Sequence, residues 1–532
     1  MEKDLFKVHL LSLAGLLSFV LTFASCANED AVQKKADVDN DNDKNLTTFS
    51  TGIEPESRTS MDYNSGAFYW EAGDYIFVKD DNDEWQQSSN TPTTKTTNFK
   101  FYVPGDFKNR NTYEVYYPGK YAYYDQVTIL TAQTQTEPNS TIHFGESGDC
   151  GTATATKYVS ATGHIDFRFS IDHQAAYLVF QPYTNNKGLQ QCYLTKIEVS
   201  SDNDIASTYT LDPVNGLTGT GTGKKITLTT KGSGTYTNGF PLNTNSANVT
   251  TNGAYMIIKP GQHTLTVRYW VKDIITQVEG AITKTLSSFN YIKNNYYDMT
   301  AELDVKNYKV NDYYQWDAQK PYWYGYEWDK GGSQPTLNFH LQGSTTSNDY
   351  AKNASDPRYY NNSFPGYKVI NNGTTPHFKK MPTSNEMVWY AAKGDAHWDD
   401  DKLWTCMNHL YKGGIWLKKK AFISGFNKDK DPNEKDVRED PTGNFYYTIS
   451  KKTAPSASEI NQYFYLPALG QYVEGRQYTV GASGYYWSSN GMSWGDDLAQ
   501  YLVFDKWSIQ MNFGYRSSGI VAQPFTDFGE DE

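Results

Sequence analysis

Cysteine, positive charge and long apolar runs are all scarce in this sequence. Four cysteines in 532 residues cannot form a disulfide framework, and their spacing matches no cysteine-based metal site. A net charge of −12 excludes a nucleic-acid-binding protein, because neutralising phosphate groups requires a basic face. After residue 26, no run reaches the roughly 20 apolar residues that a membrane-spanning helix needs. Long helical or heptad patterns are also few.

Aromatic residues, in contrast, are abundant: they make up 15% of the chain and include 43 tyrosines and 13 tryptophans. Aromatic side chains suit pleated, half-buried surfaces, so a mainly β protein is expected. Between residues 46 and 303, short apolar runs alternate with turn residues, which is typical of β-sandwiches. The clearest expected strands are 68–70, 75–78, 113–117, 177–180, 192–199, 254–258 and 265–271.

The N-terminus has the pattern of a lipoprotein signal. Lys3 and Lys7 precede an apolar run over residues 8–23, and small residues lead directly to Cys26. We expect Cys26 to be lipid-modified and to become the first residue of the mature chain. The alternative is an ordinary secretory signal with an incidental cysteine. Residues 27–45 are acidic and polar, with too little apolar surface to fold, and are expected to be a flexible tether.

The three remaining cysteines do not indicate a reactive centre. Cys150 and Cys192 lie in β-rich segments and could form a disulfide in an oxidising compartment, although spacing alone cannot establish the pair. Cys406 has apolar neighbours and is expected to be a buried, inert thiol. No cofactor is expected.

Five motifs occur in order in the β-rich region: Arg58-Thr59-Ser60, Trp70-Glu71-Ala72-Gly73-Asp74, Tyr116-Tyr117-Pro118, Gln133-Thr134-Gln135, and the segment 169–176. Their order and spacing resemble the fimbrillin family (Mfa-like major fimbrial subunits), the lipoprotein-derived pilus subunits of Bacteroidetes. The resemblance covers residues 46–303. It implies two tandem β-sandwiches, which we place at 46–175 and 176–305. In this motif set His173 is expected to be a structural residue.

The resemblance also implies a mode of assembly. Fimbrillins are cut after an arginine in their first segment, and Arg58 is the candidate processing site here. Loss of residues 46–58 would remove one strand from a sandwich and leave a groove, which a strand of another subunit could fill by β-augmentation. The alternative is that Arg58 is a surface arginine at the start of a strand.

Residues 306–335 are unusually aromatic and are expected to be a junction that packs against a third domain. Rings here could form a carbohydrate-binding platform, and the candidate ligand-facing side chains are Tyr322, Trp323, Tyr324 and Trp328. The alternative is that these rings seal a domain interface, which is a common use of aromatic side chains.

The sequence changes character at about residue 336. A helix is expected over residues 384–391, with Ser384 as its N-cap, and a second helix from Asp399 or Asp400 to Tyr411. Acidic residues precede the second segment and Gly413 follows it, as the helix dipole and C-cap geometry favour. With the strands that follow, residues 336–532 are expected to form a small α+β domain.

Four motifs carry a second resemblance: residues 381–387, 464–470, 484–489 and 515–521. In this order they are similar to the Fibrobacter major paralogous domain, which is related to formylglycine-generating sulfatase-modifying and C-type-lectin-like folds. That relationship does not imply an enzyme, because the reactive cysteine pair is missing and Cys406 stands alone. The calcium-binding tripeptides of the lectins are also missing, and His397, Asp399, Asp400, Asp401 and His409 are not expected to bind a metal.

Together these observations predict a non-enzymatic lipoprotein at the outer surface of the cell. The expected role is an accessory or tip subunit of a fimbrillin-type pilus that adheres through its C-terminal domain. Expected partners are other pilus subunits, by strand exchange, and a glycan or protein of a host or bacterial surface. Membrane contact is expected through the lipid alone. The alternative is a surface glycan-binding lipoprotein that does not polymerise.

Overall fold

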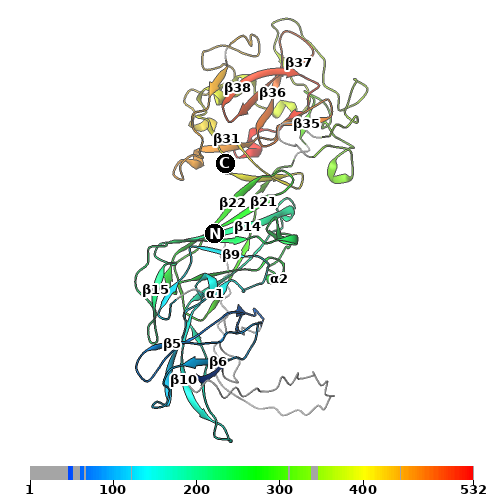
Figure 1. Cartoon of the computed structure of the whole chain (residues 1–532). Coiled ribbons are helices and arrows are strands. Elements are labelled where there is room, and N and C mark those ends of the chain that lie inside the picture. The colour runs from blue at the N-terminus through cyan, green and yellow to red at the C-terminus, as the bar shows by residue number, and fades with distance from the viewer. Residues whose placement is uncertain are drawn as a thin grey trace, which may run out of the picture.

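A computed structural model gives the fold. It describes residues 46–51, 60–64, 68–120, 123–309, 312–336, 345–443 and 445–530. The described chain is mainly β and elongated, with three domains in a row (Figure 1). Strands β6 and β10 lie at one end, β14 and β21 in the middle, and β36 to β38 at the other end.

The first domain is built on one eight-stranded sheet that curls around an apolar core. Seven strands follow the order β5-β4-β7-β10-β11-β1-β6, and β12 pairs with β10. After β5, Ser89 and Asn90 hydrogen-bond to Tyr102 and Lys100 of β6, so the two ends of the sheet meet. The bounds are β1 (Leu46–Thr51), β4 (Phe77–Lys79), β5 (Trp85–Gln87), β6 (Lys100–Pro104), β7 (Thr112–Tyr117), β10 (Gly151–Val159), β11 (Ile165–Phe169) and β12 (Asp172–His173).

This arrangement differs from the expected pair of facing sheets. Because the ends of the curled sheet bond to each other, one sheet encloses the whole core and few strand edges are exposed. The core is almost entirely aromatic and β-branched, which explains the sequence pattern without a second sheet. Its buried members are Phe49, Trp70, Ile76, Val78, Phe101, Val103, Phe107, Tyr113, Val115, Tyr117, Ala155, Phe167, Phe169 and Ile171.

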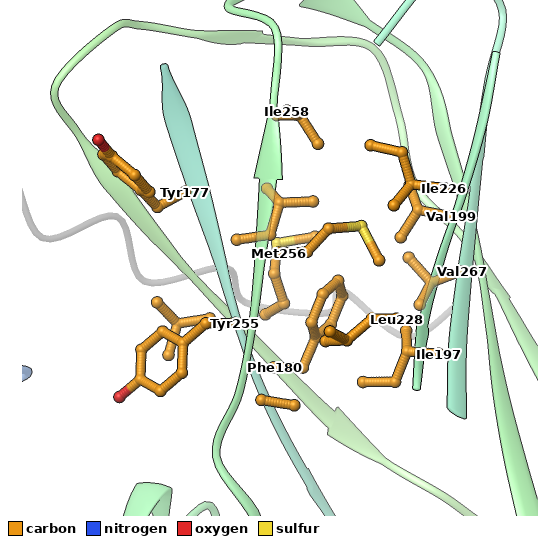
Figure 2. Close-up of a cluster of buried hydrophobic side chains, with 14 of the residues drawn as sticks. Tyr177, Phe180, Ile197, Val199, Ile226, Leu228, Tyr255, Met256, Ile258 and Val267 are labelled. Carbon is orange, nitrogen blue, oxygen red and sulfur yellow. The ribbon is translucent and has the colours of Figure 1, made fainter. Parts of the chain in front are cut away.

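The second domain is a sandwich of two facing sheets. A three-stranded sheet, β19-β13-β24, packs its apolar face against a larger sheet, β22-β21-β14-β17-β9, in which β18 also pairs with β14. Figure 2 shows Phe180, Met256 and Ile258 of the small sheet facing Ile197 and Val199 of the large one. The bounds are β9 (Ala132–Gln135), β13 (Ala176–Tyr183), β14 (Cys192–Ser201), β17 (Lys225–Thr230), β18 (Phe240–Pro241), β19 (Ala254–Ile258), β21 (Leu265–Asp273), β22 (Glu279–Thr285) and β24 (Tyr296–Glu302).

The boundary between these two domains is not the expected one at residue 175. Strand β9 pairs with β17 of the second domain, and Met61, Phe68 and Phe144 are buried in the second domain's core. Segments from the expected first sandwich therefore complete the second. The smaller elements here are β2 (Ser60–Met61), β3 (Phe68–Tyr69), β8 (Gln126–Thr128), α1 (Phe144–Ser147), β15 (Thr208–Asp212), β16 (Gly216–Thr218), α2 (Val249–Asn252), β20 (Gly261–His263) and β23 (Phe289–Tyr291).

In its described residues, the C-terminal domain combines a seven-stranded sheet with one α-helix, α3. The path of the sheet is β26-β39-β36-β37-β38-β32, and β27 pairs with β36. Smaller sheets are β28-β31-β33, β25-β29-β30 and β34-β35. The bounds are β25 (Lys306–Asn307), β26 (Tyr313–Tyr314), β27 (Asn371–Asn372), α3 (Ser384–Lys393), β28 (His397–Trp398), β29 (Leu403–Cys406), β30 (His409–Lys412), β31 (Gly414–Lys418), β32 (Tyr446–Thr448), β33 (Tyr463–Pro467), β34 (Gln471–Val473), β35 (Arg476–Tyr478), β36 (Ser483–Gly491), β37 (Leu498–Asp505), β38 (Ser508–Tyr515) and β39 (Ile520–Val521).

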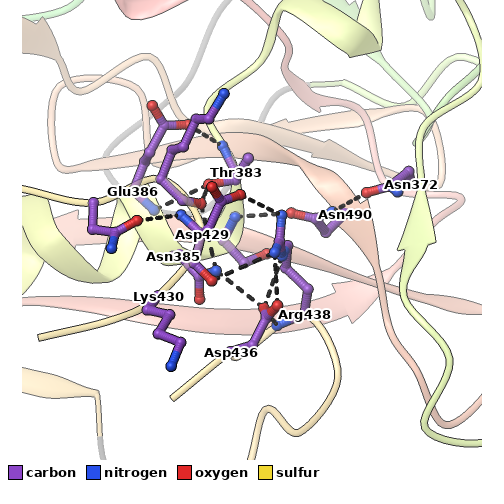
Figure 3. Close-up of polar contacts among 12 residues, drawn as sticks. Asn372, Thr383, Asn385, Glu386, Asp429, Lys430, Asp436, Arg438 and Asn490 are labelled. Atoms are coloured by element: carbon purple, nitrogen blue, oxygen red, sulfur yellow. Dashed lines mark hydrogen bonds and ion pairs between the residues drawn. The ribbon is translucent and has the colours of Figure 1, made fainter. Parts of the chain in front are cut away.

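Helix α3 confirms the first helix expected from the sequence, with one correction at its start. The N-cap is Thr383, not Ser384: its hydroxyl accepts from the Glu386 N–H at 3.2 Å, and its own N–H donates to the Glu386 carboxylate at 2.7 Å. This capping box satisfies two N–H groups that would otherwise lack partners. Ser384 instead bonds to Asn490 of β36. Figure 3 shows this network, which also includes Asn372, Asn385, Asp429, Lys430, Asp436 and Arg438.

The second expected helix, from Asp399 or Asp400 to Tyr411, is wrong. This segment forms a bend and then a tight hairpin, β29 and β30, with Met407 and Asn408 in the turn. Both turn residues have positive φ, 47° and 60°, which a two-residue hairpin turn of type I′ requires. All four residues of β29 are buried, so the alternation that marks a strand is missing from its sequence.

Candidate functional site

Strand β1 fills a slot inside the sheet of the first domain. It pairs in parallel with β11, where Phe49 lies opposite Phe167, and antiparallel with β6, where Leu46 lies opposite Pro104. Side chains add to this ladder, because the Ser50 hydroxyl donates to Asp166 at 2.8 Å. Strand β1 is therefore the partner that both β11 and β6 would lose if it were removed.

Phe49 is the main apolar contact of β1 in this slot. Its side chain is fully buried, with ring centroids 5.0 Å from Phe107, 5.1 Å from Phe167 and 6.3 Å from Tyr113. The Phe107 and Tyr113 rings meet it edge-on and the Phe167 ring is stacked. These geometries are the favourable ones for aromatic pairs. The slot thus contains an aromatic pocket that one large side chain of β1 fills.

The chain that follows β1 is anchored in a different domain. The Met61 N–H of β2 donates to the Thr141 hydroxyl at 2.8 Å, and the Tyr63 hydroxyl donates to Asp298 of β24 at 2.9 Å. A cut in the connecting residues would therefore leave β1 held by non-covalent contacts alone, while β2 stays in place. The candidate cut site, Arg58, and the candidate lipidation site, Cys26, lie outside the described residues.

A hairpin of the C-terminal domain forms the joint with the second domain. Leu410 of β30 is completely buried in the core of the second domain. Asp273, at the end of β21, accepts hydrogen bonds from the His409 ring and from the Leu410 N–H, both at 3.0 Å. Burial alone would raise the pKa of Asp273, but these bonds and the His409 charge lower it. Parallel pairing of β25 with β29 closes the joint from the other side.

A cavity of about 700 Å³ lies beside this joint. It is within the size range of small-molecule sites, roughly 300–1,000 Å³. The half-buried ring of Trp328 and the exposed Asn408 line it, together with charged residues of both signs. The charged side chains are Lys187, Glu302, Asp304, Lys306, Lys309 and Asp329.

Two of the four candidate ligand-facing aromatic residues are buried and two are accessible. Tyr322 and Trp323 are buried in the C-terminal core, where both rings contact Tyr472, so the prediction that they face a ligand is wrong. Tyr324 is exposed and Trp328 lines the cavity at the joint. Part of the segment lies at the joint, where β25 pairs with β29, and part belongs to the C-terminal domain, where β26 joins the main sheet. Its rings fill a core rather than form a continuous platform.

His173 is a structural residue, as expected. It is buried, its ring is 2.9 Å from the Asp149 carboxylate, and Phe68 stacks on it with ring centroids 4.1 Å apart. The Tyr177 hydroxyl donates to the same Asp149 oxygen. This small network joins the end of the first sheet to the second domain.

The possible disulfide between Cys150 and Cys192 is not formed, and both residues are free thiols. Cys150 packs beside Phe77 and Tyr116 in a small apolar cluster, whereas Cys192 belongs to the core of the second domain. Because the two thiols lie in separate clusters, no bridge joins them. Cys406 is a buried thiol of β29, as expected, and burial raises the pKa of all three cysteines.

Among the described residues, no group of three or more His, Cys, Asp or Glu side chains is placed to hold a metal ion. Asp399 instead accepts hydrogen bonds from the Lys402 N–H and the Trp416 indole, at 2.9 Å each. His397 contacts the Thr453 carbonyl oxygen. In the same part of the chain, no helix has the length and apolar character to span a bilayer.

No family model and no curated protein matches this chain. Solved structures with similarity include a fimbrial protein from Bacteroides ovatus, at 10% identity and a TM-score of 0.25, covering 89% of this chain and 98% of that one. Another is the fimbrial anchor protein Mfa2 from Porphyromonas gingivalis, at 13% identity and a TM-score of 0.24, covering 48% of this chain and 90% of that one. Both TM-scores are below 0.5, so the account that follows rests on this chain's own residues.

Proposed function

We propose that this chain is a surface lipoprotein, an accessory or tip subunit of a fimbrillin-type pilus that adheres through its C-terminal domain. The observation that carries the proposal is the position of β1 inside the first sheet, between β11 and β6. The connection that contains Arg58 follows it, and the chain is anchored again at β2 in the second domain. Such an arrangement suits a strand that is cut free and replaced.

The slot favours exchange over simple loss of β1. An empty slot would expose the unpaired backbone groups of two strands and the aromatic pocket around Phe167. Unpaired backbone groups and bare aromatic surface are both unfavourable in water. A strand from another subunit restores the ladder and fills the pocket, so main-chain bonds would give affinity and the side chain opposite Phe167 would give specificity.

The connection between the second domain and the C-terminal domain supports a position at one end of a pilus. Strand β24, the last of the second domain, leads within four residues to β25, which pairs with β29 of the C-terminal domain. A strand held at both ends by folded domains cannot be donated to a neighbour. On this proposal the protein accepts a strand and gives none, as expected of a subunit at one end of a pilus.

Limited proteolysis tests the proposal. The chain from Ala27 is treated with an arginine-specific protease, and Arg58→Gln serves as the matched uncut control. We expect a new N-terminus at Thr59, with residues 46–58 retained until a competing strand peptide replaces them in native mass spectrometry. Resistance at Arg58, or a cut chain that never takes up a peptide, would exclude strand exchange.

The alternative function is a surface glycan-binding lipoprotein that does not polymerise. The aromatic and amide groups exposed on the C-terminal domain favour it, and so does the cavity beside Trp328. Glycan binding that is unchanged in Arg58→Gln, in a chain that exchanges no strand, would establish this function instead.

A further inference from the structure

A second hollow lies far from the joint, on the seven-stranded sheet of the C-terminal domain. Strand β32 has three residues and pairs with β38 only through Ser508–Gln510, so the rest of β38 extends past it. Beside this extension is a hollow of about 180 Å³, which we call the β38 groove. Its main lining residues are Phe445, Tyr446, Gln510, Met511, Asn512 and Phe513.

The lining has a distinctive chemistry. None of its nine residues is charged, in a chain with 20% charged residues. Tyr446 and Phe513 have exposed fractions of 51% and 44%, so their rings are open to solvent. Gln510 and Asn512 are half-buried and add amide groups, which both donate and accept hydrogen bonds.

The groove continues into a wider aromatic surface. The ring of Trp494, also exposed, lies 6.3 Å from that of Phe513. Next to Trp494, the Ser493 carbonyl oxygen accepts from the Lys368 N–H at 2.9 Å, so the loop with exposed Tyr367 lies near Trp494. Large exposed aromatic surfaces on soluble domains mark interaction sites. Figure 1 shows β37 and β38 at the end of the molecule opposite β6 and β10.

We propose that the β38 groove binds a neutral carbohydrate; this deepens, and rests on, the proposed adhesive role of the C-terminal domain. The C–H faces of a sugar ring stack on aromatic rings such as Tyr446 and Phe513, and its hydroxyls pair with amides such as Gln510. A lining without charge fits a neutral sugar better than an acidic one. The volume is smaller than the roughly 300 Å³ at the low end of small-molecule sites, so it fits one sugar unit that projects from a longer chain.

Binding to immobilised neutral oligosaccharides tests this proposal, with sialylated and sulfated oligosaccharides in parallel. The full chain from Ala27 is expected to bind neutral members only. Phe513→Ala removes a stacking ring and should weaken binding by roughly tenfold or more. Gln510→Glu is nearly isosteric but adds a negative charge and should weaken binding similarly. Phe422 has a similarly exposed ring that does not line the groove, so Phe422→Ala should leave binding unchanged.

Melting temperatures within about 2 °C of the parent would show that the variants fold, as expected for exposed positions. The proposal is overturned if no neutral oligosaccharide binds, if acidic ones bind preferentially, or if Phe513→Ala and Gln510→Glu both bind like the parent. It is also overturned if the groove takes an extended peptide and no sugar. Since Arg58→Gln leaves the groove intact, sugar binding and strand exchange can fail independently.

Discussion

Replacing Phe49 by alanine should loosen β1 in its slot. The ring is fully buried against Phe107, Phe167 and Tyr113, with centroids 5.0 to 6.3 Å away. Phe→Ala changes in such cores cost about 3–5 kcal/mol, because apolar contact is lost and a cavity remains. We therefore expect the free energy of unfolding of the first domain to fall by that amount in urea denaturation.

The matched control is Thr47→Ala in the same strand. Thr47 is only partly buried and lies opposite Val103 at the start of the ladder, so this change should alter the free energy by less than about 0.5 kcal/mol. After cleavage at Arg58, Phe49→Ala should also speed release of residues 46–58 by roughly a hundredfold to several thousandfold, since about 1.4 kcal/mol corresponds to a factor of ten. A loss below about 1 kcal/mol would refute the idea that Phe49 holds the strand.

Three further predictions concern the other domains. Arg516 is fully buried, and its guanidinium donates to the carbonyl oxygens of Leu498 at 2.9 Å and Asn361 at 2.7 Å. A lysine cannot donate in both directions with this geometry, so Arg516→Lys should lower the unfolding free energy of the C-terminal domain by about 3 kcal/mol, measured by calorimetry. His409→Leu removes a donor to buried Asp273 and should destabilise the joint by about 1–3 kcal/mol, seen as faster hydrogen exchange at the Leu410 N–H. An unchanged exchange rate would contradict the claim that His409 and Asp273 hold the joint together. Burial lowers the pKa of His143 from 6.5 to about 4, so the unfolded chain binds a proton that the folded one does not. The free energy that neutral His143 contributes to folding is therefore fully present above pH 6.5 and is lost as the pH falls towards 4. His143→Gln should reduce the loss of unfolding free energy over this pH range by at most about 3 kcal/mol.

Elements that depend on neighbouring residues, such as an apolar strand or a capped helix, were predicted from the sequence. The expected strand over residues 254–258 has the observed bounds. The helix expected over 384–391 ends two residues later in the structure, at Lys393. In that helix, Thr383 and Glu386 form the capping box, a pattern already visible in the sequence three residues apart. Thr383 and Ser384 are adjacent and both can cap a helix, so the sequence alone does not decide between them.

The errors concern contacts between distant parts of the chain. Acidic residues before Leu403 and glycines after Lys412 imitate the ends of a helix, but β29 is a fully buried strand. Leu403 packs in the core of the second domain, whereas Trp404 and Cys406 pack in the core of the C-terminal domain. On sequence grounds Tyr322 and Trp323 could face a ligand or seal an interface, and it is Tyr472, about 150 residues later in the chain, that packs on both rings. Composition shows that rings are present, whereas tertiary packing decides which of them face solvent.

The candidate sites depend on the same kind of contact. The resemblance to fimbrillins implied that residues 46–58 could be removed, but not that β1 lies between β11 and β6. The β38 groove was not predicted at all, because Tyr446 and Phe513 are 67 residues apart and ordinary in their local sequence. The alternation of amide and apolar side chains from Gln510 to Phe513 is the one local signal that could have indicated it.

Peptide exchange after cleavage at Arg58 tests the central claim most directly. The cut chain is incubated with an isotopically heavy peptide of residues 46–58, and native mass spectrometry follows its uptake. We expect the heavy peptide to replace its light counterpart in the cut chain, slowly for the parent and faster for Phe49→Ala, and never in Arg58→Gln. A cut chain that loses residues 46–58 yet stays folded and takes up no peptide would contradict the assignment of β1 as an exchangeable strand.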